Sequence, residues 1–206
     1  MIGGDTAGDG SDNFTGQALN NVTGNQAAVL KHQFDEDLYT RQIYCLGKHY
    51  NQALEAIETN FSTFPVKELQ RLGYWHQFKR EAIDEISKKK YHKYGFQTTK
   101  LSRPLIIARL VQAVREHPEL FNDIATLEEM LTFVRNEKGK AEAQEGKHDD
   151  LILGLAIAHY ARGQEIDNPP AEKIALPETL PPDLRRDLEA DPAALAHWLS
   201  QHKKYN

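Results

Sequence analysis

The sequence contains one cysteine and no long apolar run, and both shortages restrict the kind of protein it can be. Cys45 is the only cysteine among 206 residues, so no disulfide can form within the chain, as is typical of a reducing compartment. The longest apolar run, residues 151–158, is far too short to cross a bilayer. The first residues, MIGGD, hold neither a basic region nor an apolar run, so we expect no signal peptide, no membrane anchor and no secretion.

Positive charge is also scarce across the chain as a whole, with a formal net charge of −5. A protein of this composition that binds nucleic acid must concentrate its positive charge in one region. Hydrophobic residues make up 40% and charged residues 27% of the chain, a balance that supports a packed core and excludes global disorder. The length suits one domain of moderate size with room for an appendage.

The order of apolar patterns predicts a mixed α/β chain with a central sheet. The first part predicts a β-hairpin, a helix and a short buried strand, at residues 14–22 with 26–33, 35 to about 50, and 53–59. Residues 3–13 are rich in glycine and aspartate and are expected to form a loop that leaves a strand ending at Met1 and Ile2. Because that strand begins abruptly, we expect the chain to be a fragment of a longer polypeptide.

The second part of the chain is expected to be mainly helical. Residues 62–86 are predicted to be helical in part, with breaks near Pro65 and Gly73, and residues 87–99 to form a loop or an edge strand. Further elements are expected at residues 104–117 (helix), 126–134 (helix), 141–143 (short strand) and 148–162 (helix). Thr126 and Glu129 have the spacing of a capping box.

The last of these helices is apolar on all sides, so we expect it to be buried against the sheet. After Gly163, prolines punctuate the sequence and a short leucine-bearing helix with Trp198 is expected to follow. We therefore divide the chain into a domain at residues 1–162 and a Pro-rich linker with a C-terminal helical tail at residues 163–206.

Four acidic residues stand at the tips of expected core elements. Asp5 follows an apolar strand end, Glu58 ends the strand ALEAIET, and Asp149 and Asp150 begin the buried helix. Each alone is more often a turn residue or a helix-start acid. Together they can converge at one edge of a sheet, where clustered carboxylates repel one another unless a cation neutralises them. Oxygen ligands select Mg²⁺ or Mn²⁺, and two such ions can promote phosphodiester hydrolysis.

The spacing of small residues favours one of the two neighbouring aspartates. Asp150 and Gly154 are four residues apart and share a helix face. A glycine inside a helix costs about 1 kcal/mol relative to alanine, so its presence is sensible where the helix presses closely on a sheet. We expect Asp150 to be the principal ligand and Asp149 a supporting or second-metal ligand. Asp9 and Asp12 in the first loop are weaker candidates.

The same segments resemble the C-terminal nuclease domain of large terminase subunits from tailed phages. The resemblance rests on GGDTAGDGSD, AIETN and AEAQEGKHDDLILGLAIAHY, with further likeness in YGFQTTKLSRPLIIARL and LEEMLTFV, and covers roughly residues 1–162. It implies an RNase H-like fold, close to the Holliday-junction resolvase type, and an endonuclease that cuts concatemeric viral DNA during packaging. It also implies Asp5 as the first-strand metal ligand, Glu58 as the ligand of a later strand, and Asp149 and Asp150 as helix-borne ligands of two Mg²⁺ or Mn²⁺ ions.

Residues 87–115 hold eight lysines and arginines and no acid. Such a cluster can neutralise phosphates and release counter-ions, so we expect duplex DNA to contact it through phosphates, with weak sequence preference. Tyr91, Tyr94 and Phe96 are interleaved with the cluster and could stack on bases or pack internally. A solvated face is the simpler alternative. The candidate DNA-binding residues are Lys88, Lys89, Lys90, Lys93, Lys100 and Arg103.

A phosphate loop of the form GxxxxGK[ST] is missing: Gly146 and Lys147 are followed by His148, without a glycine at the required earlier position. We therefore expect a nuclease that lacks the ATPase motor. The resemblance implies as partners the terminase ATPase domain, the small terminase subunit and the portal, in the host cytoplasm. Two alternatives stay open. One is another RNase H-like nuclease, such as a junction resolvase. The other is a non-catalytic module that docks to the portal or procapsid, for which residues 168–206 are a candidate.

Overall fold

The computed structural model describes residues 1–6, 13–33, 35–83, 88–137, 139–167, 180–182, 184 and 185. It divides into two compact units, Met1–Asn168 and Pro169–Asn206, and the first unit carries the features discussed below. The weaker candidates Asp9 and Asp12, and Trp198 of the tail, lie outside the described residues. Within the described part, no helix is both long and apolar enough to span a membrane.

A four-stranded mixed sheet lies at the centre of the first unit, with strand order β3-β2-β1-β4. β1 (Ile2–Asp5) pairs antiparallel with β2 (Phe14–Leu19), and β2 pairs antiparallel with β3 (Gln26–His32). β4 (Glu55–Ile57) pairs with β1 in parallel. The hairpin and the buried strand expected from the sequence are therefore present. β1 continues to Asp5, so the expectation of a loop from residue 3 was wrong for residues 3–5.

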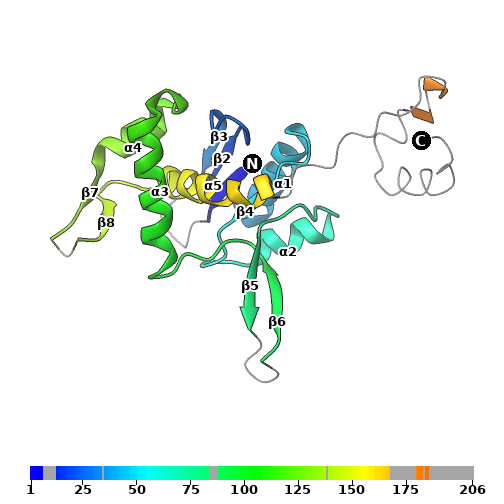
Figure 1. Cartoon of the computed structure of the whole chain (residues 1–206), viewed down its shortest axis with the longest axis horizontal. Coiled ribbons are helices and arrows are strands. Elements are labelled where there is room, and N and C mark those ends of the chain that lie inside the picture. Colours follow the sequence, from blue (N-terminus) through cyan, green and yellow to red (C-terminus); the bar gives the residue numbers. More distant parts are fainter. Residues whose placement is uncertain are drawn as a thin grey trace. The chain divides into compact units, whose positions relative to one another are not determined.

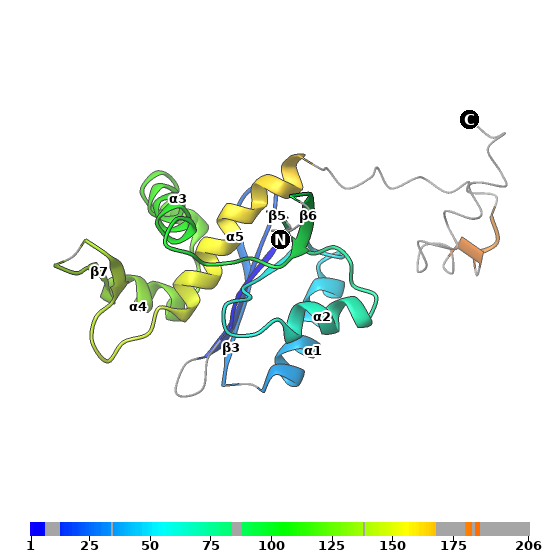
Figure 2. The ribbon, with the colours of Figure 1, turned by 90° about the horizontal axis from the view of Figure 1, so that it is seen from below.

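Helices cover both faces of this sheet (Figures 1 and 2). α1 (Glu36–His49) and α2 (Phe64–Arg71) lie on one side, and α5 (Asp150–Asp167) crosses the other side next to α3 (Ser102–Glu116) and α4 (Ile124–Thr132). Side chains alternate between the two faces of the sheet, so the strands contribute to two hydrophobic cores. Ala56 packs in the core with α5, whereas Ile2 and Ile57 pack in the core with α1. α5 is the buried apolar helix predicted from the sequence.

Glycine allows α5 to approach the sheet closely. A Cβ atom on Gly3 would lie 2.3 Å from the carbonyl oxygen of Gly154 and 2.4 Å from the backbone nitrogen of Ala158. A Cβ on Gly154 would lie 2.9 Å from Oγ1 of Thr15 in β2. The glycine inside the helix therefore has the packing reason expected from the sequence, and the close approach of α5 explains the glycine at position 3 of β1. Gly4 faces the other side of the sheet, where a Cβ would meet the side chains of Tyr39 and Ile57.

Two smaller hairpins extend the domain. β5 (Lys79–Ile83) and β6 (Lys90–Tyr94) pair antiparallel and project from the body (Figure 1). β7 (Phe133–Arg135) pairs with β8 (Ala141–Ala143), and a short 3₁₀ helix, Pro118–Leu120, follows α3. β5 was not foreseen, because its sequence KREAI lacks a clear two-residue apolar period. Pro65 stands in the first turn of α2, where proline is tolerated, instead of breaking a helix.

The expected capping box at the start of α4 was wrong. The helix begins at Ile124, and the Asp123 carboxylate accepts hydrogen bonds from the backbone nitrogen and the hydroxyl of Thr126, both at 2.7 Å. Asp123 thus takes the capping role that the sequence pattern assigned to Thr126. The carboxylate of Glu129 makes its contacts outside α4, as described below.

Candidate active site

Strand pairing brings Asp5 and Glu58 together. β1 and β4 are parallel with Gly4 opposite Ile57, and the Glu58 N–H donates to the Gly4 carbonyl at 2.9 Å. The two carboxylates therefore lie side by side, each at the carboxyl end of its strand. Alternation places both on the face that α5 covers, the face of Gly3 and Ala56. Both side chains are buried, with exposed fractions of 6% for Asp5 and 3% for Glu58.

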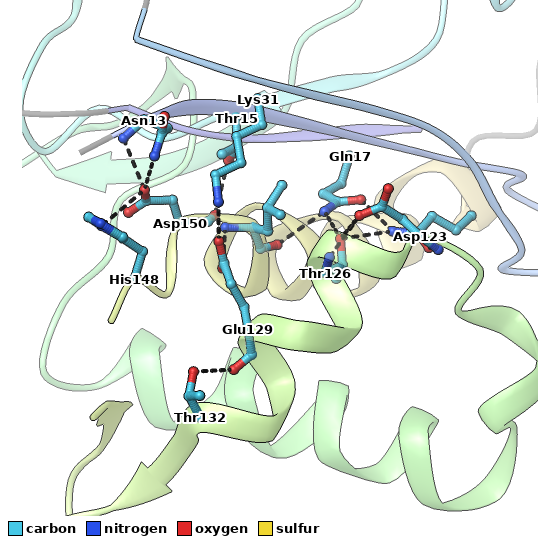
Figure 3. Close-up of polar contacts among 12 residues, drawn as sticks. Asn13, Thr15, Gln17, Lys31, Asp123, Thr126, Glu129, Thr132, His148 and Asp150 are labelled. Carbon is cyan, nitrogen blue, oxygen red and sulfur yellow. Dashed lines mark hydrogen bonds and ion pairs between the residues drawn. The ribbon is translucent and has the colours of Figure 1, made fainter. Parts of the chain in front are cut away.

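Asp150 reaches the same place from the first turn of α5. One of its carboxylate oxygens, Oδ2, accepts from the backbone nitrogen of Asn13 at 2.9 Å and from Asn13 Nδ2 at 3.2 Å (Figure 3). The hydroxyl of Thr15 donates to the Asp150 carbonyl at 3.0 Å. These contacts join the helix start to β2 and orient the Asp150 carboxylate, which is buried like that of Asp5.

The four carboxylates predicted from the sequence line one cleft of about 490 Å³, together with Glu142 and three cationic side chains. α3, β8 and the segment before α5 contribute part of its wall. Its charged lining residues are Asp5, Glu58, Arg103, Lys140, Glu142, Lys147, Asp149 and Asp150. The arrangement places carboxylates and cations within reach of one ligand.

Burial is the main cause that raises the pKa of the Asp5 carboxyl well above its usual range. The neighbouring Glu58 raises this pKa further, through its charge and a hydrogen bond, and Asp150 and Asp149 add smaller effects. Repulsion among acids at the base of a cleft is relieved by a cation, and carboxylate oxygens are the ligands that hard divalent cations prefer. The donor set therefore fits Mg²⁺ or Mn²⁺.

These carboxylates are not preassembled. Within the part of the chain that the structure describes, no three Asp, Glu, His or Cys side chains already form a metal-binding group. Two of the four acids have other partners: Asn13 binds Asp150, and Arg103 Nη2 lies 2.8 Å from Asp149 Oδ2. Asp150 has a larger effect than Asp149 on the pKa of Asp5.

The expected DNA-binding residues fall into two places. Arg103 lines the cleft, where it also donates to the Ala141 carbonyl at 3.3 Å. The lysines are exposed on or beside the β5–β6 hairpin and before α3, and none of them lines the cleft. Lys90 pairs with Glu81 at 3.0 Å, and Lys93 Nζ lies 5.4 Å from the centre of the Tyr91 ring. The exposed lysines are Lys88, Lys89, Lys90, Lys93 and Lys100.

Sequence reasoning missed several residues of this region. Lys140 and Lys147 line the cleft; Lys147 belongs to the GKHDD motif, which could have indicated it, whereas Lys140 stands in no recognisable pattern. Asn13 was not singled out, because a polar residue at the end of a loop has no distinctive spacing. Phe96 is buried in the core and packs 5.7 Å from Phe78 between ring centres, so it is not a base-stacking residue.

Comparisons with known proteins place this geometry in context. No family model matches the chain, and no curated protein matches its sequence. The crystal structure of the large terminase nuclease from thermophilic phage G20c is similar, with a TM-score of 0.56 and 20% identity, over 77% of this chain and 80% of that one. The chain has the fold of a large terminase nuclease. This RNase H-like fold, a mixed sheet flanked by helices, is the fold predicted from the sequence.

A second structure of the same phage nuclease contains bound magnesium. It matches with a TM-score of 0.59 and 18% identity, over 77% of this chain and 79% of that chain. Both likenesses cover more than three quarters of each protein. At these identities the likeness establishes the fold, and the chemistry has to be argued from the cleft.

Proposed function

We propose that this chain is a metal-dependent DNA endonuclease, the nuclease part of a phage large terminase that cuts concatemeric viral DNA during genome packaging. The observation that carries the proposal is the convergence of Asp5, Glu58, Asp149 and Asp150 on one cleft at the carboxyl ends of β1 and β4. The fold supports it, because the similar G20c protein is a nuclease and one of its structures contains magnesium.

Asp5, Glu58 and Asp150 would hold a first divalent cation, and Asp149 would contribute to a second. When bound, the cations supply Lewis-acid activation of water and neutralise charge on the phosphodiester. The protein's own contribution is positional. Pairing of β1 with β4 fixes two carboxylates side by side, and Asn13 orients the Asp150 carboxylate so that its second oxygen can bind a cation. α5 begins at Asp150, directly after Asp149, and packs against the sheet that bears Asp5.

Cationic side chains that line the cleft would bind the DNA backbone. Arg103, Lys140 and Lys147 line the cleft within reach of a phosphate held by the metal site. The lysines of the β5–β6 hairpin would hold the duplex farther along through phosphates, so sequence preference would be weak.

The wider setting follows from the same proposal. The chain would act with an ATPase domain, a small terminase subunit and the portal, in the host cytoplasm. The domain would comprise residues 1–162 and the tail residues 163–206 would dock or link it. A junction resolvase shares the RNase H-like fold, so the preferred DNA substrate distinguishes a resolvase from a terminase nuclease.

The proposal is tested by incubating supercoiled plasmid with the protein and Mg²⁺, Mn²⁺ or EDTA. We expect nicking with either ion, none with EDTA, and no effect of ATP. Asp5→Asn and Glu58→Ala should lose cleavage, and Asp37→Asn, at an exposed acid of α1, is the matched control. Full cleavage by both active-site variants would contradict the proposal. A strong preference for four-way junctions would indicate a resolvase, and metal-induced stabilisation without any nicking would indicate a docking module.

A further inference from the structure

Glu129 joins three elements around the base of the candidate active site (Figure 3). Its side chain is 8% exposed and comes from α4. Oε1 accepts from Lys31 Nζ of β3 at 2.7 Å, and Oε2 accepts from the backbone N–H of Leu151 in α5 at 2.9 Å. One carboxylate thus connects a strand, its own helix and the beginning of another helix.

The contact to α5 falls where the helix needs a partner. The first N–H groups of a helix have no acceptor within the helix, and a negative charge there is favourable. Leu151 is the residue directly after Asp150, and its own carbonyl accepts from Gln17 Nε2 at 3.3 Å. Glu129 and Gln17 therefore hold the peptide groups that follow the Asp150 carboxylate, one from α4 and one from β2.

Lys31 supplies the charge that a buried carboxylate requires. An ion whose partner is removed from a buried pair is left uncompensated, and this is strongly destabilising. Here the pair spans β3 and α4, so it also fixes the distance between the sheet and the helix that caps α5. The Thr132 hydroxyl donates to the Glu129 carbonyl at 3.1 Å and completes the turn from which the side chain extends.

We propose that Glu129, with Lys31 as its counter-ion, is a positioning residue that fixes the first turn of α5 and so aims the Asp150 carboxylate at Asp5 and Glu58. This role rests on the proposed metal site. Glu129 itself does not line the cleft, so its contribution reaches a cation only through Asp150. Loss of Glu129 should weaken metal binding more than it changes the chemistry of the loaded site.

The test measures Mn²⁺ affinity in the whole chain without DNA, by isothermal titration calorimetry at a temperature well below the melting transition. Glu129→Ala should weaken binding by at least about tenfold, the usual effect of losing a group that orients a ligand. Glu129→Gln keeps an oxygen that can accept from the Leu151 N–H and should recover most of the affinity. Glu128→Ala, at an exposed position of the same helix, should bind like the wild type.

A cleavage assay adds a readout that general destabilisation would not produce. Glu129→Ala should need more Mn²⁺ for half-maximal rate but approach the wild-type kcat when Mn²⁺ saturates. Wild-type Mn²⁺ affinity in Glu129→Ala would overturn the inference. Should that variant not fold, Lys31→Met, which removes the counter-ion of Glu129, replaces it, and wild-type Mn²⁺ affinity in Lys31→Met would overturn the inference equally. A wild-type chain that binds no Mn²⁺ would overturn the metal site itself and, with it, the proposed function.

Discussion

Arg103 Nη2 of α3 lies 2.8 Å from Asp149 Oδ2, so a candidate DNA-binding cation is paired with a candidate metal ligand. Both side chains are about one quarter exposed and face the same cleft. Under the proposed function, Arg103 would have two competing acceptors, the Asp149 carboxylate and a DNA phosphate. If a phosphate binds the guanidinium, the Asp149 carboxylate becomes free to bind a cation. DNA binding would then be coupled to the binding of a second metal ion.

Replacing Arg103 separates these two roles. Arg103→Gln should weaken binding of duplex DNA, because a charged hydrogen-bond donor to phosphate is lost, and should reduce the slope of log affinity against log salt by roughly one. The measurement is a fluorescence anisotropy titration over a range of salt concentrations, in EDTA. Arg115→Gln, at an exposed position on the same helix that does not line the cleft, is the matched control. An unchanged salt slope would place the phosphate elsewhere.

Asp5→Asn should remove activity and stabilise the metal-free protein. Cleavage should fall by more than roughly 100-fold, since even residues that only orient metal ligands contribute about 10–100-fold. The same change removes a carboxyl group whose ionisation is opposed by burial and by the neighbouring Glu58 and Asp150. In EDTA the melting temperature should rise by roughly 2–4 °C, which corresponds to about 1 kcal/mol in a domain of this size. A lower melting temperature would show that the acids are not in repulsion.

The stability of the metal-free protein should also depend on pH through Asp5. Burial, and then Glu58, raises the pKa of this carboxyl above the usual 3.8. The folded state therefore holds the proton more tightly than the unfolded state, and its stabilising effect is lost as pH rises from 3.8 through the raised pKa. Denaturant titrations in EDTA should show this loss in the wild type and a flatter profile in Asp5→Asn. Identical profiles would contradict the raised pKa.

His159 on α5 should give a pH dependence of opposite sign. Its ring is 7% exposed, lies 5.6 Å from Phe121 between ring centres, and has an Nε2 without a hydrogen-bond partner. Burial, helped by Arg162, lowers its pKa from 6.5 to about 4. The unfolded chain therefore takes up a proton first, and stability should fall by up to about 3 kcal/mol as pH drops from 6.5 to 4.

His159→Phe should abolish this loss. The quantity to compare is the difference in unfolding free energy between variant and wild type, because the contribution of Asp5 is the same in both and cancels. This difference should grow in favour of the variant as pH falls. His117→Gln, at an exposed histidine, should leave the profile as it is. A constant difference between pH 6.5 and 4 would mean that the His159 ring is not held neutral in the fold.

Gly3→Ala should separate α5 from the sheet. The new Cβ would meet backbone atoms of Gly154 and Ala158 at 2.3 and 2.4 Å, which cannot yield without moving the helix. We expect destabilisation of about 3 kcal/mol, as for an overpacked core, together with weaker Mn²⁺ binding because Asp150 moves with α5. Gly163→Ala is the control in the same helix: its Cβ would meet only Arg109 Nη1, at 3.8 Å. It should stabilise by up to about 1 kcal/mol.

Much of this architecture could be predicted from the sequence because its main elements carry strong local patterns. The hairpin of β2 and β3, the helix α1 and the apolar α5 are visible as periodic runs bounded by turn residues. Asp5, Glu58 and Asp150 could be singled out because each stands at the tip of such an element. Their convergence depends on β1 pairing with β4, which follows from the family's fold and from no single segment.

The supporting residues could not be predicted, because their roles come from contacts across the fold. Glu129 has the spacing of a capping box, yet its carboxylate bonds to α5 and β3, over 22 and 98 residues of sequence. Asn13 acts on an acid 137 residues away. Local pattern describes a residue's neighbours in the chain, whereas these contacts depend on the packing of α4 and α5 against the sheet.

The parallel pairing of β1 with β4, and the docking of α5 over both, also sets when the protein can become active. Asp149 follows Asp5 by 144 residues, so the helix-borne acids are synthesised well after the strand-borne acids. Domains tend to fold as units during synthesis, so an incomplete polypeptide lacks one wall of the cleft. During translation the proposed metal site could therefore form only once α5 has been made, and a product truncated before α5 would lack it.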